Sequence, residues 1–385
     1  MDFDLSEEQQ AFRTVLKDFT DREIRPIARQ FEHAGEYPDA VVEKMKAMGL
    51  FGVTVPEEYG GLGLDLVSMA LVFEELSRGW MGVAGVIGSH SLSCRMIAVH
   101  GTEEQKQRWL PGLATGDERT GIGLTEADAG SDLQGIKTRA VRDGDHYVIS
   151  GQKTWITNAR RATMLPILVK TDPDATPAHR GMSVLLVETD RPGFAVTNDM
   201  GKLGYKGPET CELSLDGVRV PAANLLGGAE GAGLKQVLSG LEVGRVNIAA
   251  RAVGVAQEAL DQSVAYAKER HAFGQPIAAF QAIQLKIADM ATDAQAARLL
   301  TWYAASQVDA GRRADREAGM AKYFASEVAI RASLEAMRIH GGMGYSTELD
   351  IERLYRDAPL MAIGEGTNDI QRMVIARSFL GDAAR

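Results

Sequence analysis

The chain of 385 residues is long enough for about two or three domains, and its composition, 45% hydrophobic and 24% charged, is typical of a soluble globular protein. A formal net charge of −10 argues against nucleic acid or an anionic membrane surface as the main partner. Only two cysteines, Cys94 and Cys211, are present, so the sequence implies no disulfide framework and fits a reducing compartment.

The first ten residues, Met1 to Gln10, are acidic and polar. They contain neither an apolar signal core nor an Arg-rich transit segment. No uninterrupted apolar run in the chain is long enough to cross a bilayer. We therefore expect a soluble, cytoplasmic protein, with a mature mitochondrial matrix form as the alternative.

The N-terminal region has the apolar spacing of helices. Ser6 and Gln9 form a capping-box pattern, and apolar residues then recur at three- and four-residue steps as far as Phe31. Further helices are expected around Ala40–Met48, Val67–Ser77 and Glu103–Leu110. We assign residues 1–118 to an N-terminal helical domain.

The apolar period becomes that of strands between Tyr147 and Val220. The predicted strands are Tyr147–Ser150, Met164–Lys170, Met182–Glu188 and Cys211–Leu215. Leu213 and Leu215 alternate with polar neighbours, which predicts a half-exposed antiparallel sheet. A glycine-rich linker, Gly227–Gly233, ends this region, and residues 119–228 are assigned to a middle β domain.

Long helical patterns dominate the rest of the chain. They cover Arg245–Glu269, Phe280–Ala310 and Asp315–Ile339, and a shorter terminal helix is predicted at Asn368–Leu380. Residues 229–385 are therefore assigned to a C-terminal helical bundle. The predicted fold class is multidomain α+β.

Several common kinds of site are absent from the sequence. The seven histidines are scattered and no Cys/His cluster occurs, so we expect no metal site. The chain has no G-x-S-x-G elbow and no Walker loop. Neither Gly60–Gly63 nor Gly341–Gly344 matches the Rossmann pattern G-x-G-x-x-G, so a Rossmann site is not expected.

Two polar segments near the start of the sheet region are candidates for contact with a planar ligand. In Leu124–Asp132, small residues and hydroxyls would let backbone N–H groups approach a ring or a phosphate, although a capped interdomain turn is the favoured interpretation of this segment on its own. In Lys153–Asn158, a tryptophan beside two threonines could cover one face of a flavin or belong to the core.

Two further segments lie in the helical bundle. Arg270, between two long helices, is either a surface residue of a helical hairpin or a phosphate contact. Glu365 stands between two glycines, directly before a helix capped by Thr367 or Asn368. A helix N-terminus favours the charged carboxylate, whereas an apolar pocket raises its pKa, and a base near neutrality requires the second effect to be larger. A solvated loop carboxylate is the simpler interpretation.

In this order and spacing, the four segments together resemble the acyl-CoA dehydrogenase family. The likeness covers essentially the whole chain and includes the turn Val53–Gly61. It implies an N-terminal α-helical domain, a middle antiparallel β domain and a C-terminal four-helix bundle, assembled as a homotetramer. FAD would lie between the β domain and the bundle and reach a neighbouring subunit.

The resemblance also implies contacts to FAD. The flavin ring would be bonded or covered by Leu124, Thr125, Trp155 and Thr157. The adenine dinucleotide end would be held from the adjacent subunit by Arg270, Phe273, Gln281, Gly341 and Gly342. Arg338 stands where the family usually has Gln and would serve the pyrophosphate, while Thr367 and Asp369 would contact FAD near the base.

The implied reaction is α,β-dehydrogenation of an acyl-CoA to the trans-2-enoyl-CoA. Glu365 would remove the α proton while a hydride leaves the β carbon for flavin N5, and the electrons would pass to an electron-transferring flavoprotein. The backbone N–H of the base would polarise the thioester oxygen. Substrate contacts would come from Ser131, Glu242, Arg245 and Gly366.

Some family members carry the base just before the Arg of a motif matching Leu241–Arg245. That residue is Gly244 here and cannot act as a base, which leaves Glu365. The chain also departs from the family at Ala127, where Pro is common, and at Gly364, where Tyr often precedes the base. The helix expected to floor the acyl pocket, Gly82–Gly88, is small or apolar, so we predict a wide pocket for a branched, cyclic or longer acyl group without a terminal charge.

Three alternatives remain open. An acyl-CoA oxidase or flavin oxygenase of the same fold would release hydrogen peroxide. A dehydrogenase of carrier-protein-bound acyl groups would ignore free CoA thioesters. A non-catalytic flavin- or acyl-binding protein would be expected to have lost Glu365.

Overall fold

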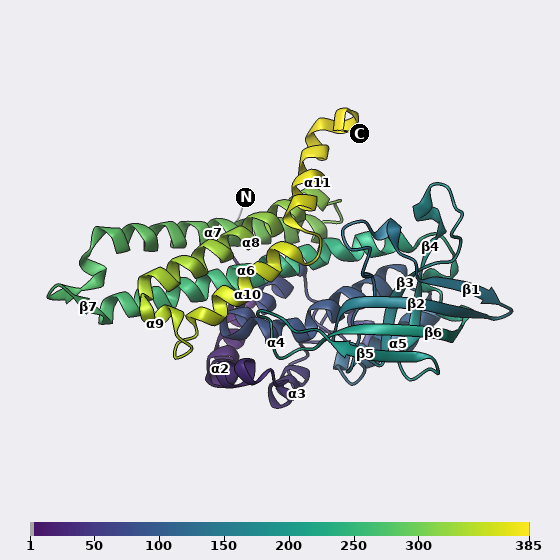
Figure 1. The fold of residues 1–385 in the computed structure, drawn as a ribbon, viewed down its shortest axis with the longest axis horizontal. Coiled ribbons are helices and arrows are strands. Elements are labelled where there is room, and N and C mark those ends of the chain that lie inside the picture. The colour runs from purple at the N-terminus through teal and green to yellow at the C-terminus, as the bar shows by residue number, and fades with distance from the viewer. Residues whose placement is uncertain (1–3, 385) are drawn as a thin grey trace.

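The computed structural model describes residues 4–384, so the first three residues of the acidic N-terminus lie outside the described part. The structure has three regions, of which the sheet and the helical bundle follow one another along the long axis (Figure 1). A sheet occupies one end, a long helical bundle extends to the other, and the N-terminal helices pack beside their junction. This arrangement confirms the predicted fold class.

The N-terminal region is helical, as predicted. Helix α1 (Glu7–Phe19) begins at the predicted capping box of Ser6 and Gln9, and a π-helical turn joins it to α2 (Arg25–Ala34). The remaining helices of this region are α3 (Asp39–Ala47), α4 (Leu66–His100) and α5 (Glu103–Thr115).

Helix α4 is much longer than the predicted Val67–Ser77, and its one non-helical residue is Trp80. By length and composition alone it would be long and apolar enough to cross a membrane, although its apolar residues do not form the uninterrupted run that the sequence analysis considered. Inside the structure, however, 78% of its most apolar window is buried. This burial is typical of a core helix.

The sheet has six strands in the order β4-β3-β1-β2-β6-β5. Their bounds are β1 (Arg139–Asp143), β2 (His146–Thr157), β3 (Met164–Lys170), β4 (Met182–Glu188), β5 (Phe194–Asp199) and β6 (Thr210–Pro221). The predicted bounds of β3 and β4 are confirmed. The neighbouring strands are antiparallel except β1 and β3, which meet in parallel at Arg139 and Lys170. The sheet is therefore mixed, whereas the sequence predicted an antiparallel one.

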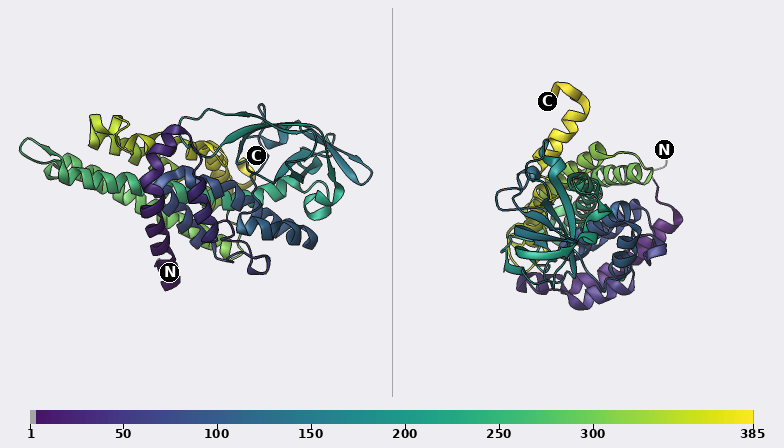
Figure 2. Two further views of the ribbon diagram at one scale, coloured as in Figure 1. Left: turned by 90° about the horizontal axis from the view of Figure 1, so that it is seen from below. Right: turned by 90° about the vertical axis from the view of Figure 1, so that its right-hand side faces the viewer.

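The C-terminal region is the predicted bundle. It contains α6 (Gly233–Glu269), α7 (Gln281–Asp309), α8 (Asp315–His340), α9 (Gly342–Tyr345), α10 (Ile351–Ile363) and α11 (Asn368–Leu380). Helices α6, α7, α8 and α10 form the four-helix bundle. A hairpin of β7 (His271–Ala272) and β8 (Gln275–Pro276) closes its far end. Helix α11 packs on α8 and carries the C-terminus away from the bundle (Figure 2).

Helices α4 and α6 pack closely and run antiparallel. A Cβ on Gly254 would lie 2.2 Å from the carbonyl oxygen of Glu74, near the start of α4. At the other end of the interface, a Cβ on Gly240 would lie 2.7 Å from the side chain of Met96. Glycines at these positions therefore permit the close approach on which the candidate site is built.

Candidate active site

Glu365 lies in the loop between α10 and α11 in a left-handed backbone conformation, with φ of 56°. The following Gly366 has φ of 86°, and a Cβ there would lie 2.6 Å from Nε2 of Gln371. Left-handed backbone is unfavourable for a non-glycine residue, so the surrounding structure must hold it in place.

Lys322 of α8 supplies much of that support. Its ammonium is fully buried and donates to the carbonyl oxygens of Ala362 (3.2 Å) and Gly366 (2.8 Å) and to Oδ1 of Asn368 (2.9 Å). Gln371 also donates to the Gly366 carbonyl oxygen, at 3.3 Å. Burial lowers the pKa of Lys322 to about 8. None of these supporting contacts was predicted from the sequence.

The Glu365 carboxylate is half-buried and surrounded by positive charge. Burial raises its pKa above the usual range, while Arg251, Arg245 and Lys322 oppose that rise. The carboxylate is therefore less acidic than an exposed glutamate.

Gly244 of α6 faces this carboxylate directly. A Cβ at Gly244 would lie 2.7 Å from Oε2 of Glu365 and 3.0 Å from Cδ1 of Leu92 in α4. The carboxylate thus lies in the space that a side chain at position 244 would occupy.

Of the two predicted substrate residues on α6, Arg245 acts directly on the charge of the base, and Glu242 lies next to Arg245. Arg245 is buried and pairs with Asp315 at 3.2 Å, and its Nε has no hydrogen-bond partner among the described residues. Burial raises the pKa of the neighbouring Glu242. Ser131, by contrast, lies exposed in a loop of the β domain.

The four predicted flavin-ring residues come together around the C-terminal part of β2. A register irregularity between Lys153 and Ile156 turns Trp155 outward, with φ of 62° and 52% of its surface exposed. The interpretation of Trp155 as a core residue is therefore wrong. Thr157 is half-buried and shares a hydrogen bond with Thr210, at 3.3 Å.

The loop containing Leu124 and Thr125 is fixed to β2. The buried Lys153 ammonium donates to the carbonyl oxygen of Leu124 (3.0 Å) and pairs with Glu126 (2.8 Å). The N–H of Thr154 donates to the carbonyl oxygen of Thr125 at 2.9 Å. The N–H groups of Leu124 and Thr125 donate no hydrogen bond within residues 4–384 and remain available to a ligand.

Helix α4 connects this part of the β domain with the base. Asn158, directly after β2, donates to the carbonyl oxygen of Val86 at 2.9 Å. Leu92, farther along the same helix, borders Gly244 and the Glu365 carboxylate. The β-domain group and the base therefore belong to one region of the molecule.

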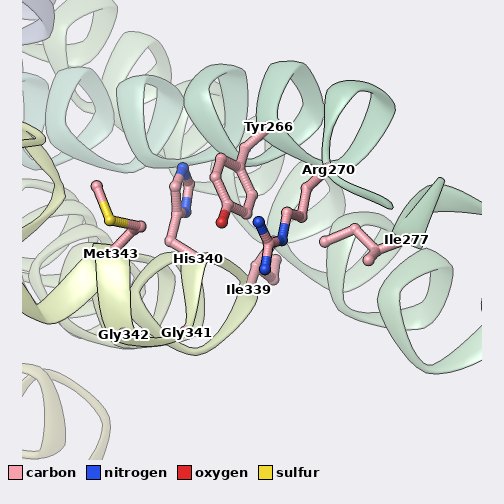
Figure 3. Close-up of a pocket in the computed structure, with 8 residues that line it drawn as sticks. All are labelled: Tyr266, Arg270, Ile277, Ile339, His340, Gly341, Gly342 and Met343. Atoms are coloured by element: carbon pink, nitrogen blue, oxygen red, sulfur yellow. The ribbon is translucent and has the colours of Figure 1, made fainter. Parts of the chain in front are cut away.

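The other predicted cofactor residues lie at the far end of the bundle. A cavity of about 410 Å³ is lined by Tyr266, Arg270, Ile277, Ile339, His340, Gly341, Gly342 and Met343. Figure 3 shows Tyr266 and Arg270 projecting from α6 toward α8, where His340 stacks on Tyr266 with ring centres 4.2 Å apart. Phe273 is 94% exposed at the hairpin tip and packs edge-on against Phe280.

The structure separates some of the predicted residues from this cavity. Arg338 pairs with Glu335 and lines another depression, between α7 and α8. Gln281 is exposed at the first residue of α7. About 39 Å of helix axis, at 1.5 Å per residue, separates Arg270 from Gly244 beside the base. One dinucleotide bound near Trp155 therefore cannot touch both groups within one chain.

The residues after the base have local roles. Thr367, not Asn368, caps α11 by accepting a hydrogen bond from the N–H of Ile370 at 3.3 Å. Asp369 is exposed, 3.8 Å from Arg372.

The space above the α4 glycines is filled. A Cβ on Gly82 would lie 2.7 Å from Nε1 of Trp80, and one on Gly85 would lie 2.1 Å from the Tyr205 hydroxyl. A Cβ on Gly88 would lie 1.8 Å from Nη2 of Arg251. These side chains fill the room that the glycines leave, so the small residues of α4 do not by themselves make the pocket wide; the predicted acyl preference is not tested by these contacts.

Glu32, His33 and Glu352 bring three potential metal ligands within 4.8 Å of one another. Arg356 is paired with both glutamates. The cluster is therefore accounted for as an ion-pair network.

Comparison with known proteins gives one consistent result. Family models described as acyl-CoA dehydrogenase N-terminal, middle and C-terminal domains match residues 6–117, 121–218 and 231–380. A probable acyl-CoA dehydrogenase, YngJ, of Bacillus subtilis is 48% identical over 99% of this chain and 100% of its own length. The structure of butyryl-CoA dehydrogenase from Megasphaera elsdenii superposes with a TM-score of 0.96 at 37% identity, covering 99% of this chain and 100% of that one. A structure described as the electron transferring flavoprotein of Acidaminococcus fermentans has a TM-score of 0.96 at 39% identity, covering 99% and 100%.

Proposed function

The chain belongs to the acyl-CoA dehydrogenase family, and from this premise we propose that Glu365 is the base of its α,β-dehydrogenation of an acyl-CoA thioester. The enzyme is an oxidoreductase acting on CH–CH groups, and its product is the trans-2-enoyl-CoA. The observation that carries the base assignment is the position of the Glu365 carboxylate directly over Gly244. The two positions at which family members carry the base, 244 and 365, thus lie next to each other. Of the two residues found there, only Glu365 can accept a proton.

Glu365 performs two tasks in this proposal. Its carboxylate accepts the α proton, and burial raises its pKa toward the range in which a base works well. Its backbone N–H makes no hydrogen bond to any described residue and is free to donate to the thioester oxygen. A donor aimed at that oxygen stabilises the charge that develops as the proton leaves.

FAD is the cofactor that these residues fit. When bound, it supplies the acceptor for the hydride from the β carbon. The free N–H groups of Leu124 and Thr125 suit the polar edge of its ring, and the outward-facing indole of Trp155 suits its face. Thr157 and Thr367 complete the proposed contacts near the base.

A homotetramer is proposed for the assembly. The cavity at Arg270, Gly341 and Gly342 is too far from Trp155 to serve the same FAD within one chain. A second copy would bring that cavity and the exposed Phe273 to the cofactor. Gln281, Arg338 and Asp369 could contact FAD only if a second copy of the chain brings the cofactor to them.

An electron-transferring flavoprotein is the proposed electron acceptor. The resemblance to acyl-CoA dehydrogenases implies this acceptor, and a structure described by that name contains a chain with the fold of this one. We propose a cytoplasmic location on the grounds of sequence alone.

The test of the proposed function is an anaerobic titration. The purified protein should show a flavin spectrum that bleaches with at least one member of an acyl-CoA panel. If no CoA thioester bleaches the flavin but a carrier-bound acyl group does, the substrate is a carrier-protein thioester and not an acyl-CoA. Rapid hydrogen peroxide release in air would indicate an oxidase, and absence of flavin would overturn the proposal.

The pH dependence of the reaction reports on the base. Because burial raises the pKa of Glu365, the acid limb of kcat/KM should lie above pH 4.5, the ordinary value for glutamate. Arg245→Gln removes a cation that lowers this pKa, so the limb should move to still higher pH. Initial rates across pH 4–9 measure both. A limb that does not move, or moves down, contradicts the electrostatic account.

A further inference from the structure

Arg251 differs from the other buried arginines in having no carboxylate partner. It lies on α6 and is 5% exposed, and its Nε donates to the neutral side chain of Asn247 at 2.7 Å. No acidic oxygen of the described residues lies within ion-pair distance of it. Arg298, by comparison, pairs with Glu74 at 2.9 Å.

A buried cation without a counter-charge is unfavourable. Removing a charge from water costs several kcal/mol unless an opposite charge or a full set of hydrogen bonds replaces the water. The surroundings of Arg251 are the rings of Phe73 and Tyr205, 5.5 and 5.8 Å from its guanidinium carbon, together with α4. The Glu365 carboxylate acts on this cation electrostatically but lies beyond ion-pair distance, so the position of the direct counter-ion is left for an anionic ligand.

The guanidinium lies close to the base along the α4–α6 interface. Its Nη2 occupies the space over Gly88, whereas the Glu365 carboxylate lies beside Leu92 and Gly244. Gly88 and Leu92 are about one helical turn apart, or roughly 6 Å. Arg251 is also the foremost cation acting on the pKa of Glu365. An anion bound to Arg251 would therefore lie only a few bonds from a carbon whose proton Glu365 removes.

Tyr205 adds a second polar group at the same place. Its hydroxyl fills the space over Gly85, one turn along α4 from Gly88. The backbone is held in a left-handed conformation, with φ of 55°, and its N–H donates to the buried Asp357 at 2.6 Å. The phenol and the guanidinium are thus fixed before any ligand arrives.

We propose that Arg251 and Tyr205 bind a carboxylate at the distal end of the acyl group, so that the substrate is the CoA thioester of a four- or five-carbon dicarboxylic acid. This inference rests on the proposed function. The chain length rests on the spacing of about one helical turn between Gly88, where the guanidinium lies, and Leu92, beside the base. The bound carboxylate is the direct ion-pair partner that no described residue supplies to Arg251.

Matched substrates test the proposal on the intact holoenzyme. Succinyl-CoA is compared with 4-methylpentanoyl-CoA, and glutaryl-CoA with 5-methylhexanoyl-CoA, because an isopropyl group then replaces the carboxylate. In the wild-type enzyme, kcat/KM should be higher for at least one acid than for its neutral partner. In Arg251→Gln, the ratio of the two values should fall about 100-fold, and in Tyr205→Phe by less, because the loss of one partner from a buried charge pair is costly.

Arg298→Gln is the matched control, since it removes an equally buried arginine that pairs with Glu74 away from the base. It should leave the substrate ratio unchanged even if stability falls. A wild-type preference for both neutral thioesters overturns the inference while leaving the proposed function intact, and needs no variant to fold. If Arg251→Gln lowers kcat/KM equally for the acid and the neutral member of each pair, Arg251 does not bind the carboxylate and acts only on the charge of the base, which also overturns the inference. No bleaching by any thioester would reject the proposed function itself.

Discussion

Glu365→Gln should lower kcat for the dehydrogenation by about 10²- to 10⁴-fold. The amide keeps the size and the backbone conformation of the residue but cannot accept the α proton. Flavin absorbance and unfolding by urea should remain close to wild type, so the loss will appear only when substrate reduction is followed by stopped flow. Activity within tenfold of wild type would remove Glu365 from the role of base.

A relocated base provides a sharper control. In the double variant Gly244→Glu with Glu365→Gly, a carboxylate would reach the same space from α6, because a Cβ at position 244 lies 2.7 Å from the present Oε2. We expect kcat of this double variant to be at least tenfold higher than that of Glu365→Gly alone. If the double variant is no more active than Glu365→Gly, a carboxylate at position 244 does not reach the substrate carbon that Glu365 deprotonates.

Lys322→Met should lower the free energy of unfolding by about 3 kcal/mol. The substitution leaves the carbonyl oxygens of Ala362 and Gly366 and the Asn368 amide without their buried donor. Because the same contacts hold the loop of Glu365, kcat should also fall. Urea unfolding followed by tryptophan fluorescence measures the first effect, and flavin bleaching the second.

Lys286→Met is the matched control for that experiment. Lys286 pairs with Glu335 on the neighbouring helix but is 35% exposed, and such pairs contribute about 1 kcal/mol or less. If Lys322→Met were as mild as this control, the loop of the base would have to be held mainly by Gln371.

Burial patterns explain which elements the sequence predicted. Strands β3 and β4 are buried on both faces and stand out as apolar runs with clear ends. Strand β1 was missed because only Ala140 is buried in it. Helix α10 was missed because it contains Pro359, which normally argues against a helix interior. The full length of α4 was hidden by its glycines.

The parts of the candidate site that depend on neighbouring residues in the sequence could be predicted. Two glycines around Glu365 indicate an accessible carboxylate, and the resemblance supplied its partners. Lys322 and Arg251 each stand alone among small or apolar helix residues, a pattern that indicates a buried charge. What surrounds them depends on contacts between elements far apart in the chain. The glycines of α4 consequently suggested an open pocket, although Tyr205 and Arg251 fill it.

The close approach of Gly88 and Arg251 also constrains how this enzyme can evolve. A side chain at position 88 would meet Nη2 of Arg251 at 1.8 Å, so a substitution there displaces the guanidinium. The guanidinium is the far end of a flexible side chain, so it would have to swing away from α4 to admit a larger residue there. Because Arg251 is also the foremost cation acting on Glu365, a substitution at position 88 would change the electrostatic setting of the base together with the shape of this part of the site.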